Sequence, residues 1–181
     1  MRYLRTKLGV AGTAVALVFL TGCLLLSGTF VAVITVKAVD FNAENGFYYE
    51  PVDLSKNDVW EDHKDKIKNI ETVGFELWIT NNGVADETFK VYLDDFSNDS
   101  LTSVAAVEAN ATIVLDNLNL PANSPTHVTY GQSFGLLKNV DKLKELVGKG
   151  RFHYYGLSSA GNVDNYVIDS VRIVITFLAG V

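Results

Sequence analysis

The sequence is poor in cysteine and proline and has few basic residues. Its 181 residues include one cysteine, so no disulfide can form within the chain and no metal cluster can be built from thiolates. Three prolines, 14 glycines and no low-complexity tract exclude a long disordered stalk. The formal net charge is −6 and no basic stripe is visible, so nucleic-acid binding is not expected. A chain of this length builds a single ordinary domain with its own core.

The first 23 residues have the layout of an export signal. Met1 to Lys7 is positively charged, Leu8 to Phe19 is apolar, and Leu20-Thr21-Gly22-Cys23 follows. This tetrapeptide resembles the lipobox of bacterial lipoproteins, in which an apolar residue and two small residues precede the lipid-bearing cysteine. The resemblance implies cleavage before Cys23 and acylation of that residue with chains such as palmitate. It also implies a location in the cell envelope, anchored to a bacterial membrane and facing the periplasm or the exterior.

An uncleaved transmembrane helix is the alternative for this segment. A stretch of 29 residues without a charge separates Lys7 from Lys37, more than the ~20 that a helix needs to span a bilayer. Glycines dilute the stretch, however, and Thr29 to Val39 is rich in the β-branched residues typical of a strand.

Removal of the signal leaves 12 basic against 21 acidic residues, a formal charge of −9. The expected division is a signal peptide, a short tether and a β-sandwich domain, at residues 1–22, 23–28 and 29–181.

Alternating hydrophobic residues predict a mainly β protein. In Thr72 to Thr80, every second residue from Val73 to Ile79 is apolar, and Trp78 falls on the opposite face. The turn Asn81-Asn82-Gly83 leads to Thr88 to Asp94, which alternates in the same way with Tyr92 on its polar face. These two segments predict an antiparallel pair with one face in water. Further strands are predicted at residues 29–39, 111–118, 151–157 and 166–178, and together they indicate a β-sandwich.

One short helix is predicted among the strands. Leu143, Leu146 and Val147 form an i, i+3, i+4 stripe of apolar residues. Asn139 or Asp141 can cap the start of this helix, and Gly148 or Gly150 can end it. We expect it to connect two strands at an edge of the sandwich.

The order of these elements, over about Ile70 to Leu157, resembles that of a known family. A strand ending in Asn81-Asn82-Gly83, then Leu120-Pro121-Ala122-Asn123-Ser124, a short strand, the helix and a last strand is similar to the water-stress domain of late-embryogenesis-abundant proteins. The Asn-Pro-Asn that usually follows the first strand of that family is absent. The resemblance implies an antiparallel immunoglobulin-like β-sandwich with a protective or binding role and no catalytic residues.

The polar motifs do not predict a catalytic or metal site. His63, His127 and His153 lack partner ligands at metal-binding spacing, and the run around His63 is expected to be a solvated charged segment. Gly131-Gln132-Ser133-Phe134-Gly135 matches the nucleophile-elbow string, but that elbow needs a parallel sheet. The turn Asp94 to Asp99 is rich in oxygen ligands for Ca²⁺, yet its spacing is not that of an EF-hand. We therefore expect no metal, no cofactor and no enzymatic activity, with a hydrolase as the least favoured function.

Aromatic residues supply the candidate binding site. Trp78 and Tyr92 lie on the polar faces of their strands, and the segment before Thr72 adds Tyr48, Tyr49 and Trp60. Exposed aromatic rows suit sugar rings or protein partners, whereas the alternative is that they cover a second sheet or a long loop. The sequence thus predicts a lipid-anchored, non-catalytic binding or structural module with a protein or glycan partner. A carbohydrate-binding or adhesive surface domain is the alternative function.

Overall fold

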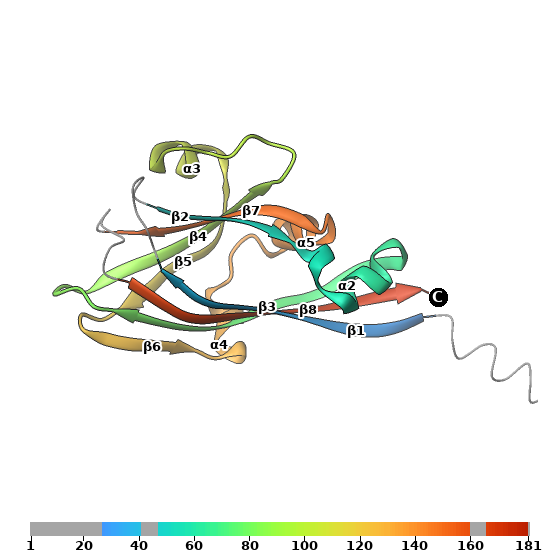
Figure 1. The fold of residues 1–181 in the computed structure, drawn as a ribbon, viewed down its shortest axis with the longest axis horizontal. Helices are drawn as coiled ribbons and strands as arrows, with labels where there is room; N and C mark the ends of the chain where they lie inside the picture. The colour runs from blue at the N-terminus through green and yellow to red at the C-terminus, as the bar shows by residue number, and fades with distance from the viewer. Residues whose placement is uncertain (1–26, 41–46, 160–165, 181) are drawn as a thin grey trace, which may run out of the picture.

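The computed structural model describes residues 27–40, 47–159 and 166–180. The lipobox Leu20 to Cys23 and the expected signal peptide lie outside these residues. Within them, eight strands form two four-stranded antiparallel sheets (Figure 1). The strands are β1 (Ser27–Asp40), β2 (Phe47–Asp53), β3 (Ile67–Asn81), β4 (Glu87–Asp95), β5 (Thr112–Leu120), β6 (Ser124–Val128), β7 (Arg151–Ser158) and β8 (Tyr166–Gly180).

The two sheets pair the first half of the chain with the second half. Sheet A has the order β1-β8-β3-β6, and sheet B has the order β2-β7-β4-β5. Strand β1 thus pairs with β8, β2 with β7, β3 with β6 and β4 with β5, as in a long hairpin rolled into two facing layers. This is the jelly-roll form of the β-sandwich. The predicted mainly β, antiparallel sandwich is confirmed, but its strand order differs from the expected immunoglobulin-like one, in which the first two strands are neighbours in one sheet.

Strands β3 and β4, which the sequence predicted as a hairpin pair, lie in different sheets. Strand β3 pairs with β8 and β6, whereas β4 pairs with β5 and β7. Asn81 turns the chain from one sheet to the other: its amide nitrogen donates to the carbonyl oxygens of Ala85 and Leu120, both at 3.0 Å, and its side-chain oxygen accepts from the Gly83 N–H. An alternating pattern identifies the buried face of a strand but not the neighbouring strand, so the predicted pair was wrong.

Four short α-helices connect the described strands, where the sequence predicted one. The predicted helix is α5 (Val140–Gly148), and its apolar stripe is buried. The others are α2 (Asp58–His63), α3 (Val104–Asn110) and α4 (Tyr130–Leu136), and the 3₁₀ turns η2 (Leu54–Lys56) and η3 (Lys64–Lys66) flank α2. The helices α2, α3 and α4 begin after Asn57, Ser103 and Thr129, and the side chain of each of these residues accepts a hydrogen bond from a backbone N–H of its helix. With about two turns each, they are too short for hydrophobic periodicity to mark them. None of the described helices is long and apolar enough to cross a membrane.

The main core lies between the sheets, and helices complete it. Trp60 on α2 is 2% exposed, and its ring packs edge-on against Phe177 of β8 with ring centroids 5.6 Å apart. A second, smaller cluster lies on the outer face of sheet B, where Val107 of α3 belongs to the same buried group as Tyr92 and Tyr155. In Figure 1, α3 lies above sheet B, and α5 lies beside β7. The sandwich therefore buries part of the outer face of sheet B in addition to its core.

Candidate functional site

A cavity of about 80 Å³ lies between the two sheets. Its walls come from β3, β4, β5, β7, β8 and α5, and they are apolar apart from the hydroxyl group of Tyr154. Protein interiors are close-packed and contain few voids larger than one water molecule, which needs only about 10–15 Å³. Because the walls offer almost no hydrogen-bond partner, water gains little from entering, and an apolar group is the better occupant.

Part of the cavity lining is exposed to solvent. Among the lining residues, Phe75, Leu137, Tyr154, Val171 and Ile173 are only half-buried. Strand β7 lies next to the edge strand β2, and β8 lies next to the edge strand β1. The exposed parts of Tyr154, Val171 and Ile173 therefore lie toward the β1 and β2 edges, a flank that we call the open side. Phe75, whose N–H is bound by Ser133 of α4, and Leu137 are the half-buried lining residues away from this flank.

Strand β2 places a carboxylate and an aromatic ring at the open side. The Tyr48 ring meets the Tyr154 ring edge-on, with centroids 5.9 Å apart and 69° between the planes. The Tyr48 hydroxyl donates to Glu50 Oε2 at 3.2 Å. Burial raises the pKa of Tyr48, and the Glu50 charge and this hydrogen bond raise it further, so the hydroxyl stays protonated. Burial likewise raises the pKa of Tyr154. Of the aromatics predicted to face a ligand, Tyr48 is the one placed beside the cavity.

The outer face of sheet A carries a second group of polar and aromatic side chains. Trp78 of β3 is half-buried and stacks on its cross-strand partner His127 of β6, with ring centroids 4.5 Å apart. Glu76 lies beside them: its carboxylate is 3.3 Å from His127 Nε2 and 3.2 Å from Arg172 Nη1. This group combines an aromatic ring with both signs of charge on an outer surface of the sandwich.

Three other predicted aromatics do not form the expected row with Trp78. Trp60 is 2% exposed and lies in the core, because α2 brings it between Phe177 and Gly150. Tyr92 is on the outer face of sheet B, as its alternation predicted, but α3 covers it and leaves 6% exposed. Tyr49 is half-buried on the same face, and its hydroxyl is 2.9 Å from His153 Nδ1. The expectation that Trp60 and Tyr92 face solvent was wrong, because α2 carries Trp60 into the core and α3 covers Tyr92.

The histidines have local partners within the fold. His63 Nδ1 lies 2.9 Å from the Val59 carbonyl oxygen, and its ring contacts Phe30 with centroids 3.8 Å apart. His153 is buried between Tyr49 and the carbonyl oxygen of Asn98, 3.1 Å from Nε2. Within the described ranges, no three His, Cys, Asp or Glu side chains are grouped to hold a metal ion.

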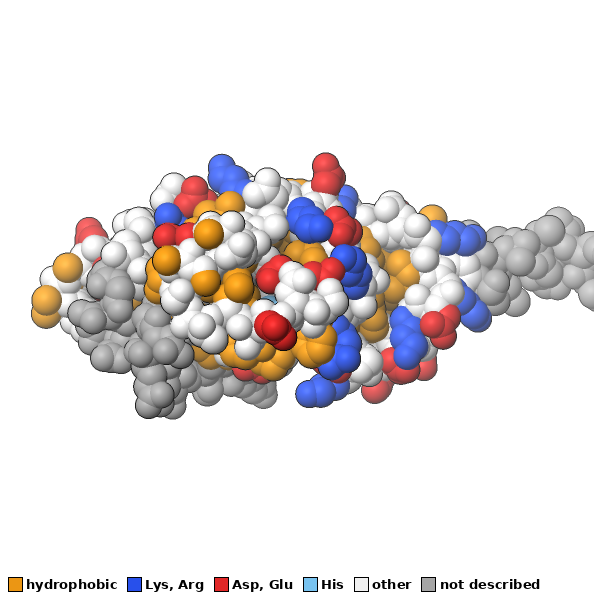
Figure 2. Space-filling model, turned by 90° about the horizontal axis from the view of Figure 1, so that it is seen from above, with side chains coloured by type: hydrophobic (Ala, Val, Ile, Leu, Met, Phe, Trp, Pro, Cys, Tyr) orange, Lys and Arg blue, Asp and Glu red, His pale blue; other side chains and the backbone are white. Residues whose placement is uncertain are grey.

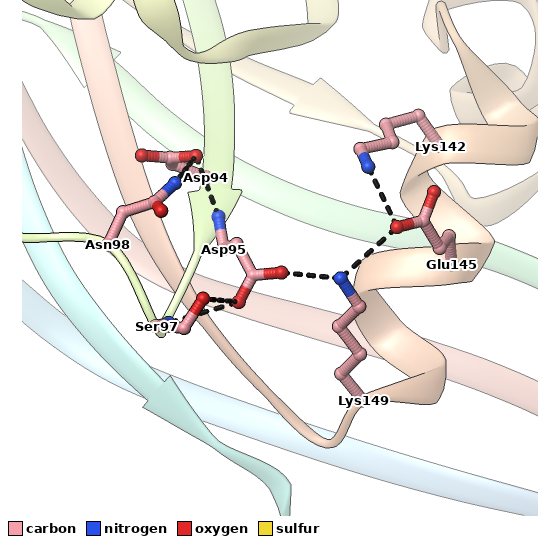
Figure 3. Close-up of polar contacts among 7 residues, drawn as sticks. All are labelled: Asp94, Asp95, Ser97, Asn98, Lys142, Glu145 and Lys149. Carbon is pink, nitrogen blue, oxygen red and sulfur yellow. Dashed lines mark hydrogen bonds and ion pairs between the residues drawn. The ribbon is translucent and has the colours of Figure 1, made fainter.

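The oxygen-rich turn after β4 uses its carboxylates within the protein. Asp94 Oδ1 accepts from the Asn98 amide at 2.8 Å, and Asp95 accepts from Ser97 and pairs with Lys149, the residue that follows α5 (Figure 3). The Lys149 hydrogen bond, followed by those of Ser97, lowers the pKa of Asp95 below its ordinary value. On the face in Figure 2, Lys and Arg side chains similarly lie next to Asp and Glu side chains. These contacts hold the turn to α5.

Ser133, the serine of the nucleophile-elbow string, lies in helix α4 and is fully buried. Its hydroxyl donates to the Tyr130 carbonyl oxygen at 2.7 Å and accepts from the Phe75 N–H at 3.2 Å. It therefore extends the hydrogen bonding of β3 beyond the point where β6 ends. The strand-to-helix elbow in a parallel sheet, which that motif requires, is not the setting of this serine.

Sequence patterns did not indicate the cavity residues as a site. Tyr154, Val171 and Ile173 look like ordinary strand residues, and Glu50 looks like a solvated charge. Their proximity depends on β2, β7 and β8 meeting across two sheets, which no local pattern encodes. The alternation of apolar and polar residues along β7 and β8 could have predicted that these side chains point into the sandwich. It could not have predicted that they line a cavity.

No protein-family model and no curated protein match the chain. The solved structures that are similar to this chain include three from viruses. The structure of Desmodium yellow mottle tymovirus is 8% identical, with 86% of this chain and 89% of that chain covered and a TM-score of 0.39. The structure of Cocksfoot mottle virus is 7% identical, with 84% of this chain and 92% of that chain covered and a TM-score of 0.43. The structure of infectious bursal disease virus Gt strain is 9% identical, with 85% of this chain and 37% of that chain covered and a TM-score of 0.33. At these identities and TM-scores the similarities carry no argument about function.

Proposed function

We propose that this chain is a lipid-anchored protein of the bacterial cell envelope, and that its sandwich is a non-catalytic module that binds a small apolar molecule. The observation that carries the binding function is the apolar cavity of about 80 Å³ with its open side. An enclosed apolar cavity of about 150 Å³ binds benzene or xenon in place of water, so apolar walls favour an apolar occupant. The lipobox ending at Cys23 supports the anchor.

In this proposal the anchor is close to one end of the sandwich. Cys23 precedes Ser27, the first residue of β1, by four residues, and Ser27 pairs with Gly180 at the end of β8 (Figure 1). Four extended residues span at most about 14 Å. The end formed by Ser27 and Gly180 therefore faces the lipid surface, while the open side of the cavity lies along the flank between β1 and β2.

The anchor is tested by labelling cells with an alkyne analogue of palmitate. We expect the wild-type chain to be labelled and to have the mass of a chain that begins at Cys23. Cys23→Ser should abolish the label and leave the full-length precursor in the membrane. An unmodified Cys23 within an uncleaved native chain would contradict the anchor.

The binding function is tested with the neutral fluorescent probe N-phenyl-1-naphthylamine on residues 24–181. This chain contains both sheets and the whole described core. We expect the probe to become fluorescent on binding and Val171→Phe, which fills the open side, to reduce that binding. Val174→Phe, on the opposite face of the same strand, is the matched control and should bind like the wild type. Absence of probe binding by the folded wild type would contradict the proposed function.

A carbohydrate-binding surface is the second candidate, because Trp78, His127, Glu76 and Arg172 meet on the outer face of sheet A. Aromatic rings bind the apolar faces of sugars, and neighbouring charged groups bind their hydroxyls. On a glycan array, Trp78→Ala should then abolish binding. Phe134→Ala removes an exposed aromatic whose ring contacts Tyr130 rather than His127, and it should leave binding intact. Equal loss in both variants, or no binding by the wild type, would contradict a glycan site at Trp78.

A further inference from the structure

The outer face of sheet A has rows of uncharged side chains next to the end that the proposed anchor joins. Cross-strand partners project from the same face of a sheet, so the register of β1, β8 and β3 defines these rows. Ile175 and Phe177 of β8 are fully buried in the core, so the residues that alternate with them face outward. Beyond the pair of Ser27 and Gly180, the next three outward rows are Thr29, Leu178 and Asn69; Val31, Thr176 and Thr72; and Val33, Val174 and Gly74.

The first charged row is the fourth one. It consists of Thr35, Arg172 and Glu76, and the last two residues pair with each other at 3.2 Å. Two more charged residues of β3, Lys68 and Glu71, are the extra residues at its bulges; both are exposed, and their charges are opposite. Because 20% of the residues in the chain are charged, nine neighbouring paired positions without a charge distinguish this surface from the rest of the exterior.

Exposed apolar side chains lie along these rows. Val31 is 49% exposed and Val33 is 38% exposed, and both belong to the edge strand β1. At the other end of the third row, rings of Tyr130 and Phe134 from α4 lie over Gly74, where a Cβ atom would be 2.5 Å from the Tyr130 ring. Phe134 is 46% exposed. The apolar surface therefore extends from the β1 edge to α4, and such patches are typical of contacts with a partner or a membrane.

We infer that the outer face of sheet A, between Val31 and Phe134, rests on the lipid surface to which the chain is anchored. This inference rests on the anchor of the proposed function, because Cys23 precedes Ser27 by only four residues, which span at most about 14 Å. Val31 lies four residues further along β1, about 13 Å from Ser27 at the usual rise of a strand. The short tether thus keeps the uncharged rows within reach of the bilayer (Figure 1).

The distribution of charge favours a lipid surface over a second copy of the chain. Charged side chains are costly among acyl chains, whereas head groups and water accommodate them. The rows follow this order: the uncharged ones are nearest the anchored end, and the pair of Glu76 and Arg172 lies farther along the face. Two copies would bring two acidic chains together, and their like charges would repel. The same acidity predicts that the contact does not depend on anionic lipids.

The test uses lipids with brominated acyl chains, which quench tryptophan fluorescence at short range. The full chain is purified in detergent and reconstituted into phosphatidylcholine vesicles, with Trp78→Phe in every variant so that Trp60 in the core is the common background. Val33→Trp places a reporter on the outer face of sheet A. Val140→Trp is the matched control, because Val140 is 39% exposed and lies beside β5 of the other sheet, where the adjacent Asn139 binds the Ile113 carbonyl oxygen.

We expect brominated lipid to reduce the fluorescence of Val33→Trp and to leave that of Val140→Trp unchanged. The reduction should be the same after phosphatidylglycerol or salt is added, since the contact is apolar. Val31→Asp, combined with the Val33→Trp reporter, should abolish the reduction, because a carboxylate at this place keeps its water. Val140→Asp with the same reporter is the control and should have no effect. Circular dichroism of each variant checks that the sandwich is folded.

The outcomes separate this inference from the anchor on which it rests. If the chain floats with the vesicles but Val33→Trp is quenched no more than Val140→Trp, the anchor holds and the inference is wrong. A signal of Val33→Trp that changes with protein density and not with brominated lipid would show that a second copy covers the face.

Quenching that needs anionic lipid and disappears in salt would mean that lysines make the contact, which also overturns the inference. So would an equal effect of Val31→Asp and Val140→Asp. If the full chain does not float with the vesicles at all, the anchor itself fails, and the inference fails with it.

Discussion

The Trp78 indole on β3 and the His127 imidazole on β6 lie nearly parallel, with ring centroids 4.5 Å apart and 12° between the ring planes. They are directly opposed residues of neighbouring strands, on the outer face of sheet A. Trp60, the other tryptophan of the chain, lies in the core with 2% of its surface exposed. The same residue type thus occupies a surface and a core position, which offers a matched test of the fold.

Replacing each tryptophan by alanine should have very different effects on stability. Trp60→Ala should lower the free energy of unfolding by about 3–5 kcal/mol, because it leaves a cavity beside Phe177. Trp78→Ala should lower it by about 0.2–1 kcal/mol, the typical contribution of a cross-strand pair. Urea unfolding of residues 24–181, followed by circular dichroism, measures both. A large loss for Trp78→Ala would place this ring in a core and contradict a binding surface at Trp78.

Tyr155→Phe should loosen the segment that precedes α3. The Tyr155 hydroxyl is buried and accepts from the Leu101 N–H at 2.9 Å. Without it the amide loses its partner, so we expect a loss of about 1–3 kcal/mol in the free energy of unfolding. Hydrogen exchange should accelerate at Leu101 and not at Ala106, whose N–H is bound by Ser103. Unchanged exchange at Leu101 would contradict this contact.

The variant Ser133→Ala distinguishes a structural role of this serine from a catalytic one. The hydroxyl accepts from the Phe75 N–H, so its removal should cost about 1–3 kcal/mol of stability. Ser100→Ala, at an exposed serine, is the control and should cost less than about 0.5 kcal/mol. Any slow hydrolysis of an activated ester by the wild type should persist in Ser133→Ala. Loss of hydrolysis in a variant with unchanged stability would instead identify Ser133 as a nucleophile.

The Asp95–Lys149 contact should make stability depend on pH in the acid range. The hydrogen bond from Lys149 lowers the pKa of Asp95 in the folded state, so the unfolded state binds the proton more tightly. The contact therefore stabilises the fold fully above the ordinary aspartate pKa of about 3.9, and this stabilisation is lost as the pH falls toward the folded-state pKa.

We expect Asp95→Asn to lower the urea midpoint slightly at pH 7, since the pair is at the surface and partly screened by solvent. The difference from the wild type should shrink near about pH 3. Asp99→Asn, in the same turn, should show no such convergence. A difference that grows on acidification would mean that Asp95 does not pair with Lys149.

The secondary structure of the long elements followed from local pattern. Alternation over Thr72 to Thr80 predicted the strand and its buried face, and Val73, Leu77 and Ile79 are buried. The stripe Leu143, Leu146 and Val147 likewise predicted α5 and its buried face. Both patterns work because burial of one face imposes a period on the sequence, 2 for a strand and 3.6 for a helix.

The position of each aromatic residue depended on elements that the pattern did not reveal. Tyr92 lies on the face that alternation assigned, yet α3 covers that face, and Trp60 enters the core because α2 carries it there. These helices are held by single capping side chains and by tertiary packing. Helices of this length are marginal on their own, since nucleation costs more than so few hydrogen bonds return.

The sequence by itself determined the β-rich class and the buried faces of the long elements, and it predicts an export signal with a candidate lipid site at Cys23, because each depends on residues close together in the chain. Only the tertiary structure decided that β3 and β4 separate into two sheets, that the strand order is a jelly roll, and that Glu50, Tyr48 and Tyr154 meet beside an apolar cavity. Pairing β2 with β7 joins segments about a hundred residues apart. Such contacts arise from the packing of whole sheets, and the same alternating pattern is compatible with several strand orders.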